Sequence, residues 1–314
     1  MPDGRQWRIV FMGTPEFALP SLSSLASTGK EVVAVVTQPD RPRGRGRKLS
    51  PPPVKVLAQE LSLPIWQPEK IRDPAIVSRL ADLAPDLFVV VAYGQILPPA
   101  LLGLPRLGAL NVHASLLPAY RGPAPINWAI INGETQTGVT TMFMDQGVDT
   151  GAILESRIIP IKETDTAKTL HDRLSKLGAD LLIQTIAGLK DGTVSPHPQP
   201  EAGASHAPLL TKSDGLLNWS RPAVELARLI RGLDPWPGAW TAHRGRSLKL
   251  FGGRTGSAQG LPGQVLGLDT GWLHVAAGEG SLLVAELQLA GQKRLAASEF
   301  WHGQRLEPGV VLGT

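Results

Sequence analysis

The sequence predicts an α/β protein in which a doubly wound, mostly parallel sheet is followed by a small β-barrel. In the first half of the chain, runs of β-branched residues alternate with stretches of helical periodicity. Beyond a segment rich in Pro, Gly and Ser, short apolar runs are separated by glycines. Continuous apolar strands between helices are typical of parallel sheets covered on both faces, whereas short strands with frequent turns are typical of barrels and sandwiches.

Five strands are expected in the first half, each a short apolar run that ends near a turn residue. They lie at 8–12, 32–36, 86–91, 108–112 and 137–144. Helices are expected after Pro15 and over 166–189, where leucines recur at the spacing of a helix face. Because doubly wound sheets bind ligands at the carboxyl ends of their strands, the residues that follow these runs are the first candidates for a site.

A change in composition near residue 191 predicts two domains. Residues 1–190 are expected to form the first domain with a basic loop at 38–53, residues 191–209 a linker, and residues 210–314 the second domain. Clusters of Pro, Gly and Ser are typical of such connections. Within the second domain we expect a helix at 222–232 and short strands at 247–251, 263–268, 272–276 and 281–289.

The composition excludes several classes of chemistry. The chain contains no cysteine, so it has no thiolate nucleophile, disulfide or cysteine metal site. No group of His, Asp and Glu has the spacing of a metal site, and no metal is expected. The N-terminal segment lacks the pattern of a signal peptide, and no run approaches the roughly 20 apolar residues of a membrane span. We therefore expect a cytoplasmic protein, and a monomer.

The segment 109–127 contains the first candidate for chemistry. Asn111 and His113 lie two residues apart on an expected strand, so their side chains project to the same face. Amide and imidazole N–H groups are suitable donors to an oxyanion, and an imidazole can also relay protons. Taken alone, the two residues favour a polar strand end that has a satisfied histidine over a catalytic site.

The second candidate is the glycine-rich loop 144–151, which contains Asp145 and Asp149. A carboxylate beside a histidine can orient it, raise its basicity or accept a proton from an attacking amine. Loops rich in Asp and Gly are also common as plain surface turns. The loop therefore indicates a site only in combination with Asn111 and His113.

The most concentrated charge lies at 41–48, where five of eight residues are basic and none is acidic. The basic residues are Arg41, Arg43, Arg45, Arg47 and Lys48. Alternating Gly and Pro keep this segment extended, and its cations can follow a row of phosphates. We expect the segment to contact nucleic acid; a solvated surface loop is the alternative.

These segments resemble the methionyl-tRNA formyltransferase family along nearly the whole chain. The first half carries the wider formyltransferase pattern in Asn111, His113, Ser115–Pro118 and Asp149. That pattern specifies the chemistry more than the acceptor. The segments that narrow the resemblance to this family are 13–17, the basic insertion from Thr37 onward, 212–219 and 231–240.

The resemblance implies a Rossmann-like catalytic domain and an oligonucleotide-fold-like C-terminal domain that contacts tRNA. It implies that Asn111, His113 and Asp149 are catalytic, and that folate contacts Ser115, Leu116, Leu117 and Pro118. The implied reaction moves the formyl group of 10-formyltetrahydrofolate to the α-amino group of methionyl initiator tRNA. The basic residues from Arg41 to Lys48 are then expected to enter the acceptor-arm region of the tRNA.

Three other functions stay open at this point. A formyltransferase that acts on an amino sugar nucleotide would share the catalytic residues and the folate, but would need no arginine-rich loop. A non-catalytic tRNA-binding module would bind without turnover. A nicotinamide dehydrogenase would fit the alternating pattern of strands and helices, but the chain lacks the spaced glycines of a dinucleotide-binding loop.

Overall fold

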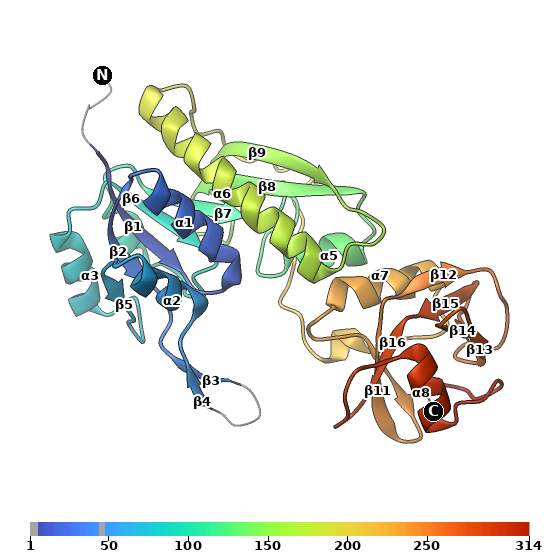
Figure 1. The fold of residues 1–314 in the computed structure, drawn as a ribbon. Helices are drawn as coiled ribbons and strands as arrows, with labels where there is room; N and C mark the ends of the chain where they lie inside the picture. The colour runs from blue at the N-terminus through green and yellow to red at the C-terminus, as the bar shows by residue number, and fades with distance from the viewer. Residues whose placement is uncertain (1–5, 44–47, 314) are drawn as a thin grey trace. The chain divides into compact units, whose positions relative to one another are not determined.

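The computed structural model describes residues 6–43 and 48–313, and its first half is built on a seven-stranded sheet (Figure 1). The strand order is β5-β2-β1-β6-β7-β8-β9. The strands are β1 (Arg8–Gly13), β2 (Glu31–Val36), β5 (Ile65–Trp66), β6 (Leu87–Val91), β7 (Ala109–His113), β8 (Gln136–Phe143) and β9 (Ile153–Pro160). The first five of these pair in parallel and β8 is antiparallel to β7, which confirms the predicted, mostly parallel sheet.

Helices cover this sheet because its central strands are apolar on both faces. Every residue of β6 is buried, and Ile9 to Met12 in β1 are fully buried. The helices of this unit are α1 (Leu19–Ser27), α2 (Pro53–Glu60), α3 (Pro74–Asp82), α4 (Pro99–Leu102) and α6 (Ala167–Asp191), while α5 (Pro125–Ile131) packs against α7 (Ala223–Leu233) instead. In the part of the chain that the structure describes, no helix has both the length and the hydropathy to cross a membrane.

The close packing of α6 on β7 decides which face of β7 is available for a site. A Cβ atom added at Gly178 of α6 would lie 2.8 Å from Cγ1 of Val112, so only glycine allows this approach. Figure 1 shows α1 and α6 on the same side of the sheet. The hydroxyl of Ser175 fixes α6 further by donating to the carbonyl of Phe17 at 2.8 Å. Because side chains alternate along a strand, Asn111 and His113 project to the face opposite α6.

The chain forms two compact units. The first contains the chain up to Gly122 together with 137–159 and 171–206. The second contains 123–136, 160–170 and the chain from Ala207 onward. Helix α5 thus packs with the later residues: the side-chain amide of Asn127 donates to the carbonyl of Gly232 at 2.7 Å.

The second unit holds two four-stranded antiparallel sheets around one apolar core, as expected for a strand-rich domain. The sheets have the orders β10-β11-β16-β17 and β12-β15-β14-β13. Their strands are β10 (Trp240–His243), β11 (Arg246–Phe251), β12 (Arg254–Gly256), β13 (Val265–Asp269), β14 (Trp272–Ala276), β15 (Ser281–Val284), β16 (Glu286–Leu289) and β17 (Leu295–Ala296). Helices α7 (Ala223–Leu233) and α8 (Ala297–Gln304) complete the unit.

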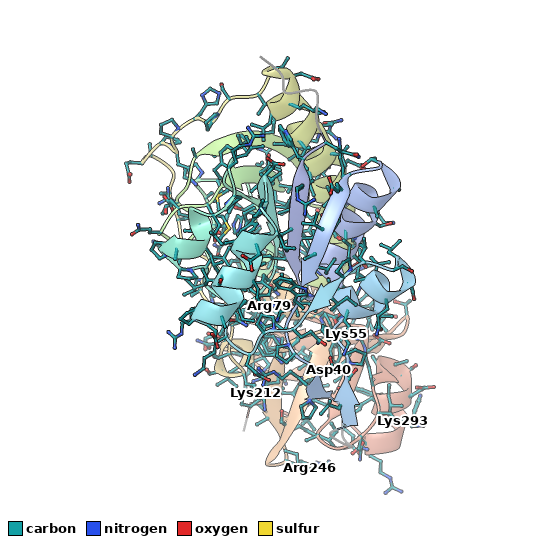
Figure 2. The ribbon with its side chains drawn as sticks, turned by 90° about the vertical axis from the view of Figure 1, so that its left-hand side faces the viewer. Asp40, Lys55, Arg79, Lys212, Arg246 and Lys293 are labelled. Atoms are coloured by element: carbon teal, nitrogen blue, oxygen red, sulfur yellow. The ribbon has the colours of Figure 1, made fainter. Side chains whose placement is uncertain are left out.

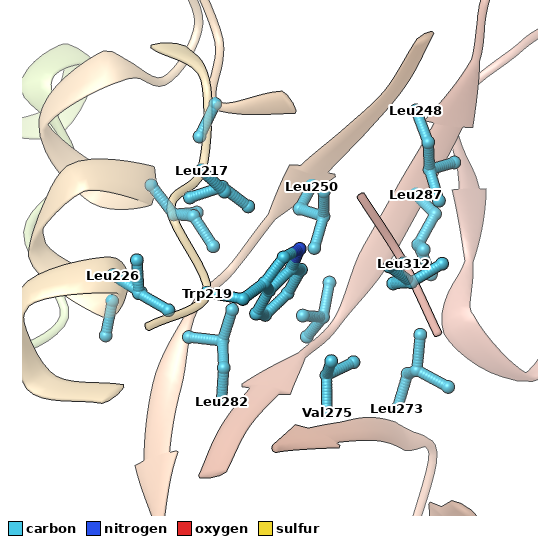
Figure 3. Close-up of a cluster of buried hydrophobic side chains, with 14 of the residues drawn as sticks. Leu217, Trp219, Leu226, Leu248, Leu250, Leu273, Val275, Leu282, Leu287 and Leu312 are labelled. Carbon is cyan, nitrogen blue, oxygen red and sulfur yellow. The ribbon is translucent and has the colours of Figure 1, made fainter. Parts of the chain in front are cut away.

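Trp219 lies among the leucines and valines of this core (Figure 3). Its indole N–H donates to Thr241 Oγ1 at 3.0 Å, so the buried polar atom has a partner. The run expected as one strand at 281–289 is divided by Ala285 into β15 and β16, which enter different sheets. Hydrophobic periodicity alone predicts a single strand over this run. The division into two strands depends on which neighbouring strand each half pairs with, and periodicity does not encode that pairing.

His243 of β10 makes the second unit sensitive to acid. The side chain is buried, and its Nε2 atom has no hydrogen-bond partner among the described residues. Burial lowers the pKa of His243, and Arg244 lowers it further. The folded state therefore binds fewer protons than the unfolded state near and below the ordinary histidine pKa of about 6.5. The stability associated with neutral His243 is present above that pH and is lost as the pH falls.

We predict that the free energy of unfolding falls between pH 7 and pH 5.5, with His243 contributing a slope of up to about 1.4 kcal/mol per pH unit. Urea unfolding followed by tryptophan fluorescence measures this slope. His243→Gln is expected to remove its share of the slope, whereas His302→Gln, at an exposed position on α8, is expected to retain it. Equal slopes for the two variants would show that His243 titrates normally.

Candidate active site

Asn111 and His113 occupy the face of β7 that α6 leaves uncovered. Asn111 is half-buried, and its side-chain amide makes a weak contact with Met144 Sδ at 4.0 Å. His113 ends the strand and is buried. The two residues lie opposite Met142 and Thr140 of β8, respectively. The structure therefore brings an amide donor and an imidazole to one face, as their spacing predicts.

The neighbours of the two ring nitrogens of His113 determine which nitrogen can act on a substrate. Nε2 lies 2.9 Å from the carbonyl oxygen of Tyr120. Because a carbonyl can only accept, Nε2 carries the proton of this bond. Nδ1 lies 3.6 Å from Asp149 Oδ2, which is an ion-pair distance when the ring is protonated but too long for a hydrogen bond. The backbone of Tyr120 thus orients the ring, and Nδ1 faces Asp149.

Asp149 reaches His113 from a loop that starts at the other end of β7. Strand β8 runs antiparallel and ends at Phe143 opposite Leu110, so the loop 144–152 begins level with the start of β7. The loop brings the Asp149 carboxylate to His113, and Oδ2 accepts a hydrogen bond from the backbone N–H of Gly122 at 2.8 Å. The site therefore extends along the face of β7, whereas the sequence predicts it at the strand ends alone.

Asp145 and Asp149, which the sequence does not distinguish, have different surroundings. Asp145 Oδ1 accepts hydrogen bonds from Gly147 N–H at 2.9 Å and from the Thr150 hydroxyl at 2.7 Å, so it shapes the loop internally. Asp149 is in the left-handed backbone region with a φ of 55° and points to His113. A non-glycine residue in this region costs on the order of 1 kcal/mol and persists only when its surroundings hold it.

The segment Ser115–Pro118 is fixed by its own hydrogen bonds. The buried hydroxyl of Ser115 donates to the carbonyl of Ala119 at 2.6 Å. Thr140 Oγ1 donates to the carbonyl of Ser115 at 2.7 Å and accepts from Leu117 N–H at 3.2 Å. Leu117 is buried, whereas Leu116 and Pro118 are half-buried. Contacts from this segment to a ligand would therefore come from apolar atoms and shape more than from the Ser115 hydroxyl.

Gln199 and Ser205 lie in the segment predicted as a linker. They form hydrogen bonds with the loop 144–152 and with the segment that follows β7, respectively. The Gln199 side chain is bonded to Arg121 and to the carbonyls of Asp149 and Gly151. Ser205 Oγ accepts from the backbone N–H of Tyr120 at 2.9 Å. Sequence reasoning misses both residues, because a Pro-rich segment far along the chain gives no sign of where it packs.

A polar network joins the carboxyl ends of β1, β2 and β6. The hydroxyl of Thr14 donates to the carbonyl of Tyr93 at 2.7 Å, and the side-chain amide of Gln38 donates to the same carbonyl at 3.3 Å. Burial raises the pKa of the Tyr93 hydroxyl, which has no hydrogen-bond partner among the described residues. Tyr93 therefore remains protonated and is a neutral, structural group at neutral pH.

The basic segment forms a two-stranded hairpin of β3 (Arg41–Arg43) and β4 (Lys48–Ser50). Arg45 and Arg47 lie outside the described residues. The Arg41 guanidinium is exposed and lies 3.4 Å from Glu69 Oε2, so it remains accessible to a phosphate. Such an exposed ion pair contributes little to stability.

The base of the hairpin is anchored by Asp40. Its carboxylate accepts from the Lys55 ammonium group at 2.8 Å and from the Gln67 amide at 2.7 Å. Figure 2 labels Asp40 and Lys55, which lie close together. The hydrogen bond from Gln67, and then that from Lys55, lower the pKa of Asp40. The hairpin therefore leaves the sheet at a defined point beyond β2.

A cavity of about 590 Å³ in the second unit is separate from this site. Arg228, Arg231 and Arg254 line it together with Glu134 and Glu163. Burial lowers the pKa of Arg231, and repulsion by Arg228 lowers it further. The cavity contains none of the predicted site residues. Within 6–43 and 48–313, no three His, Cys, Asp or Glu side chains are grouped to hold a metal ion.

Nearly the whole chain is similar to known proteins. Residues 7–186 match the family model described as formyl transferase, and residues 209–305 match the model for the formyl transferase C-terminal domain. The methionyl-tRNA formyltransferase of Pelobacter propionicus is 54% identical over 305 residues, which cover 97% of this chain and 96% of that protein. That of Geobacter sulfurreducens is 53% identical over 306 residues, 98% of this chain and 96% of that protein.

The chain belongs to the methionyl-tRNA formyltransferase family. This confirms the resemblance found in the sequence. The segment that contains Gln199 and Ser205 lies between the two matched ranges.

Solved structures confirm the fold at much lower identity. WlaRD, a sugar 3N-formyl transferase, is 18% identical with a TM-score of 0.67 and covers 92% of this chain and 100% of that one. HypX from Aquifex aeolicus, solved in complex with tetrahydrofolic acid, is 17% identical with a TM-score of 0.63 and covers 95% of this chain and 47% of that one. At this identity the family fold is shared, and nothing about the acceptor follows.

The loop that carries Asp149 requires glycine at position 151. A Cβ atom there would lie 1.8 Å from the carbonyl oxygen of Phe143, a backbone atom that cannot move aside. We predict that Gly151→Ala displaces the loop and speeds amide hydrogen exchange at Gly147 and Phe143 by roughly 10-fold, or about 1.4 kcal/mol of local stability.

Gly303→Ala is the control for this substitution, because an added Cβ atom meets nothing within 4 Å there. It is expected to leave exchange in the loop unchanged. Unaltered exchange in Gly151→Ala would mean that the loop tolerates a side chain and is less rigid than the structure indicates.

Proposed function

We propose that this protein transfers the formyl group of 10-formyltetrahydrofolate to the α-amino group of methionine on initiator tRNA. The observation that carries the chemistry is the convergence of Asn111, His113 and Asp149 on one face of β7. The acceptor is supported by the names of relatives that share more than half of their residues with this chain along almost its whole length. The product is formylmethionyl-tRNA for the initiation of translation.

In this mechanism the neutral amine of methionine attacks the formyl carbon, and the carbonyl oxygen becomes an oxyanion. The Asn111 amide donates a hydrogen bond to that oxyanion, a contribution that is typically worth about 3–4 kcal/mol of the barrier. Holding the amine and the formyl group in one crevice replaces an encounter between two molecules, which lowers the barrier further. No step requires a metal ion.

Proton movement is assigned to His113 and Asp149. The attacking amine gains a bond to carbon and must lose a proton, while N10 of the folate must gain one as its bond to carbon breaks. Nε2 of His113 is occupied by the Tyr120 carbonyl, so Nδ1 is the nitrogen that faces the reaction. Asp149 accepts the proton that the amine loses and passes it to Nδ1 of His113, and Nδ1 then donates this proton to N10 as the bond between N10 and the formyl carbon breaks.

Substrate contacts outside the catalytic residues divide between two surfaces. We assign the folate to the neighbourhood of Ser115–Pro118, whose half-buried Leu116 and Pro118 offer apolar surface. We assign the tRNA to Arg41, Arg43, Arg45, Arg47 and Lys48 and to the second unit, whose small sheets resemble a fold that binds oligonucleotides in other proteins. An enzyme with these substrates acts in the cytoplasm, and we propose that it acts as a monomer.

Replacing a catalytic residue is expected to reduce turnover while tRNA binding survives. We predict that Asn111→Ala, His113→Gln and Asp149→Asn each lower kcat by roughly 10²–10⁴-fold. Formation of formylmethionine from formyl-folate and methionyl-tRNA measures kcat, and filter binding measures the Kd for tRNA. The Kd is expected to change by less than about two-fold, because none of the three residues belongs to the basic surface.

Asp145→Asn is the matched control in the same loop. An asparagine keeps the Oδ1 acceptor that Gly147 and Thr150 use, so this variant should retain most of the activity. Near-normal turnover in Asp149→Asn would remove Asp149 from the mechanism. An unmodified protein that formylates an amino sugar nucleotide and not methionyl-tRNA would establish the alternative acceptor.

The basic hairpin is expected to act through phosphates. We predict that the double substitution Arg45→Gln and Arg47→Gln raises the KM for tRNA. It is also expected to reduce the slope of log affinity against log salt concentration by about 1–2 in magnitude. Lys190→Gln is the control, because Lys190 borders Gln6 and Trp7 at the start of β1, the opposite end of the sheet from the hairpin. A salt slope equal to that of the unmodified protein would show that the hairpin does not contact phosphates.

A further inference from the structure

Gln199 connects the loop 144–152, which contains Asp149, with the segment after β7 that contains Arg121. It lies far from both in the sequence. Its side-chain oxygen accepts from Nε and Nη2 of Arg121 at 3.0 and 2.8 Å. Its side-chain nitrogen donates to the carbonyls of Asp149 and Gly151, both at 2.8 Å. A primary amide has two donors and two acceptor positions, so these four bonds satisfy Gln199 completely.

The residue is held in place for this role by its neighbours. Pro198 and Pro200 flank it, and proline restricts the backbone and removes competing N–H donors. Both prolines are exposed, whereas Gln199 is half-buried. Upstream, His197 exchanges backbone hydrogen bonds with Ile153 at 2.8 Å in each direction, which fixes the segment beside the start of β9. The amide thus enters the site from a rigid, short piece of chain.

The contact matters because Asp149 is strained. Its φ of 55° lies in the left-handed region, where a residue with a side chain stays only if the surrounding structure holds it. Gln199 binds the carbonyl of Asp149 and that of Gly151 at the far side of the same turn, so it fixes the backbone of the strained residue. The other end of the bridge is Arg121, the neighbour of Gly122, whose N–H binds the Asp149 carboxylate.

The geometry points to Gln199 as a positioning residue that holds the Asp149 carboxylate beside His113 for formyl transfer. Gln199 does not touch the reacting atoms; it acts through Asp149. This inference rests on the proposed function, since it assigns the purpose of a contact within the same site. It predicts a loss in kcat with little change in either KM, because the polar atoms of the Gln199 side chain are already bonded to Arg121, Asp149 and Gly151.

Two variants distinguish the role of the N–H donors of the Gln199 amide from that of its acceptor oxygen. Gln199→Leu removes all four bonds. Gln199→Glu keeps the acceptor for Arg121 but cannot donate to the carbonyls of Asp149 and Gly151. Both are expected to lower kcat by at least 10-fold, with KM values for folate and tRNA within two-fold. Glu201→Gln, an exposed position on the same segment, is the matched control and should keep full activity. Full activity in Gln199→Glu would overturn the inference.

A double-mutant comparison distinguishes positioning from general stability. In an Asp149→Asn background, Gln199→Leu is expected to lower kcat by less than two-fold, since the residue through which it acts is already lost. An equal fold-loss in both backgrounds would overturn the inference and assign Gln199 a merely structural role.

Hydrogen exchange tests the contact without activity. We expect the Gly122 N–H, which binds Asp149 Oδ2, to exchange at least five-fold faster in Gln199→Leu than in Glu201→Gln. Unchanged exchange would overturn the inference. If the unmodified protein fails to formylate methionyl-tRNA, the proposed function fails, while this exchange measurement still decides whether Gln199 positions Asp149.

Discussion

The arrangement of the site depends on how one strained aspartate is kept beside one histidine. Asp149 has a left-handed backbone and lies 3.6 Å from Nδ1 of His113. Each partner is held by groups outside the pair: the Tyr120 carbonyl binds the ring, and the Gly122 N–H binds the carboxylate. The two loops therefore have to be placed correctly at the same time, and a small shift in either would separate the catalytic groups.

The antiparallel direction of β8 decides from which end of β7 the loop reaches His113. A parallel strand would leave the sheet at the carboxyl edge, and its following loop would start beyond His113. Instead β8 ends opposite Leu110, and the loop that follows it brings Asp149 to His113 from the start of β7. The opposite face is filled by α6, which approaches Val112 through Gly178. One face of β7 thus packs against α6, and the other presents Asn111 and His113, which we propose as catalytic.

The two units differ in the side chains that they contain. The first unit contains the three residues that we propose as catalytic and the anchored base of the basic hairpin, where Asp40 binds Lys55 and Gln67. The second unit is a compact strand-rich body around Trp219, with a cavity lined by several arginines. A sugar 3N-formyl transferase shares this fold at 18% identity, over 92% of the chain.

By itself the sequence determined five of the seven strands of the first sheet, the helices α1 and α6, the strand-rich second half and the family, because apolar periodicity and local motifs are carried by neighbouring residues. It did not predict β5, β9 or the helices α2 to α5. The i, i+2 spacing of Asn111 and His113 also predicts their common face. The tertiary structure decided the direction of β8, the division of 281–289 between two sheets, the different roles of Asp145 and Asp149, and the place of Gln199. Each depends on contacts between residues far apart in the chain, which local patterns do not encode.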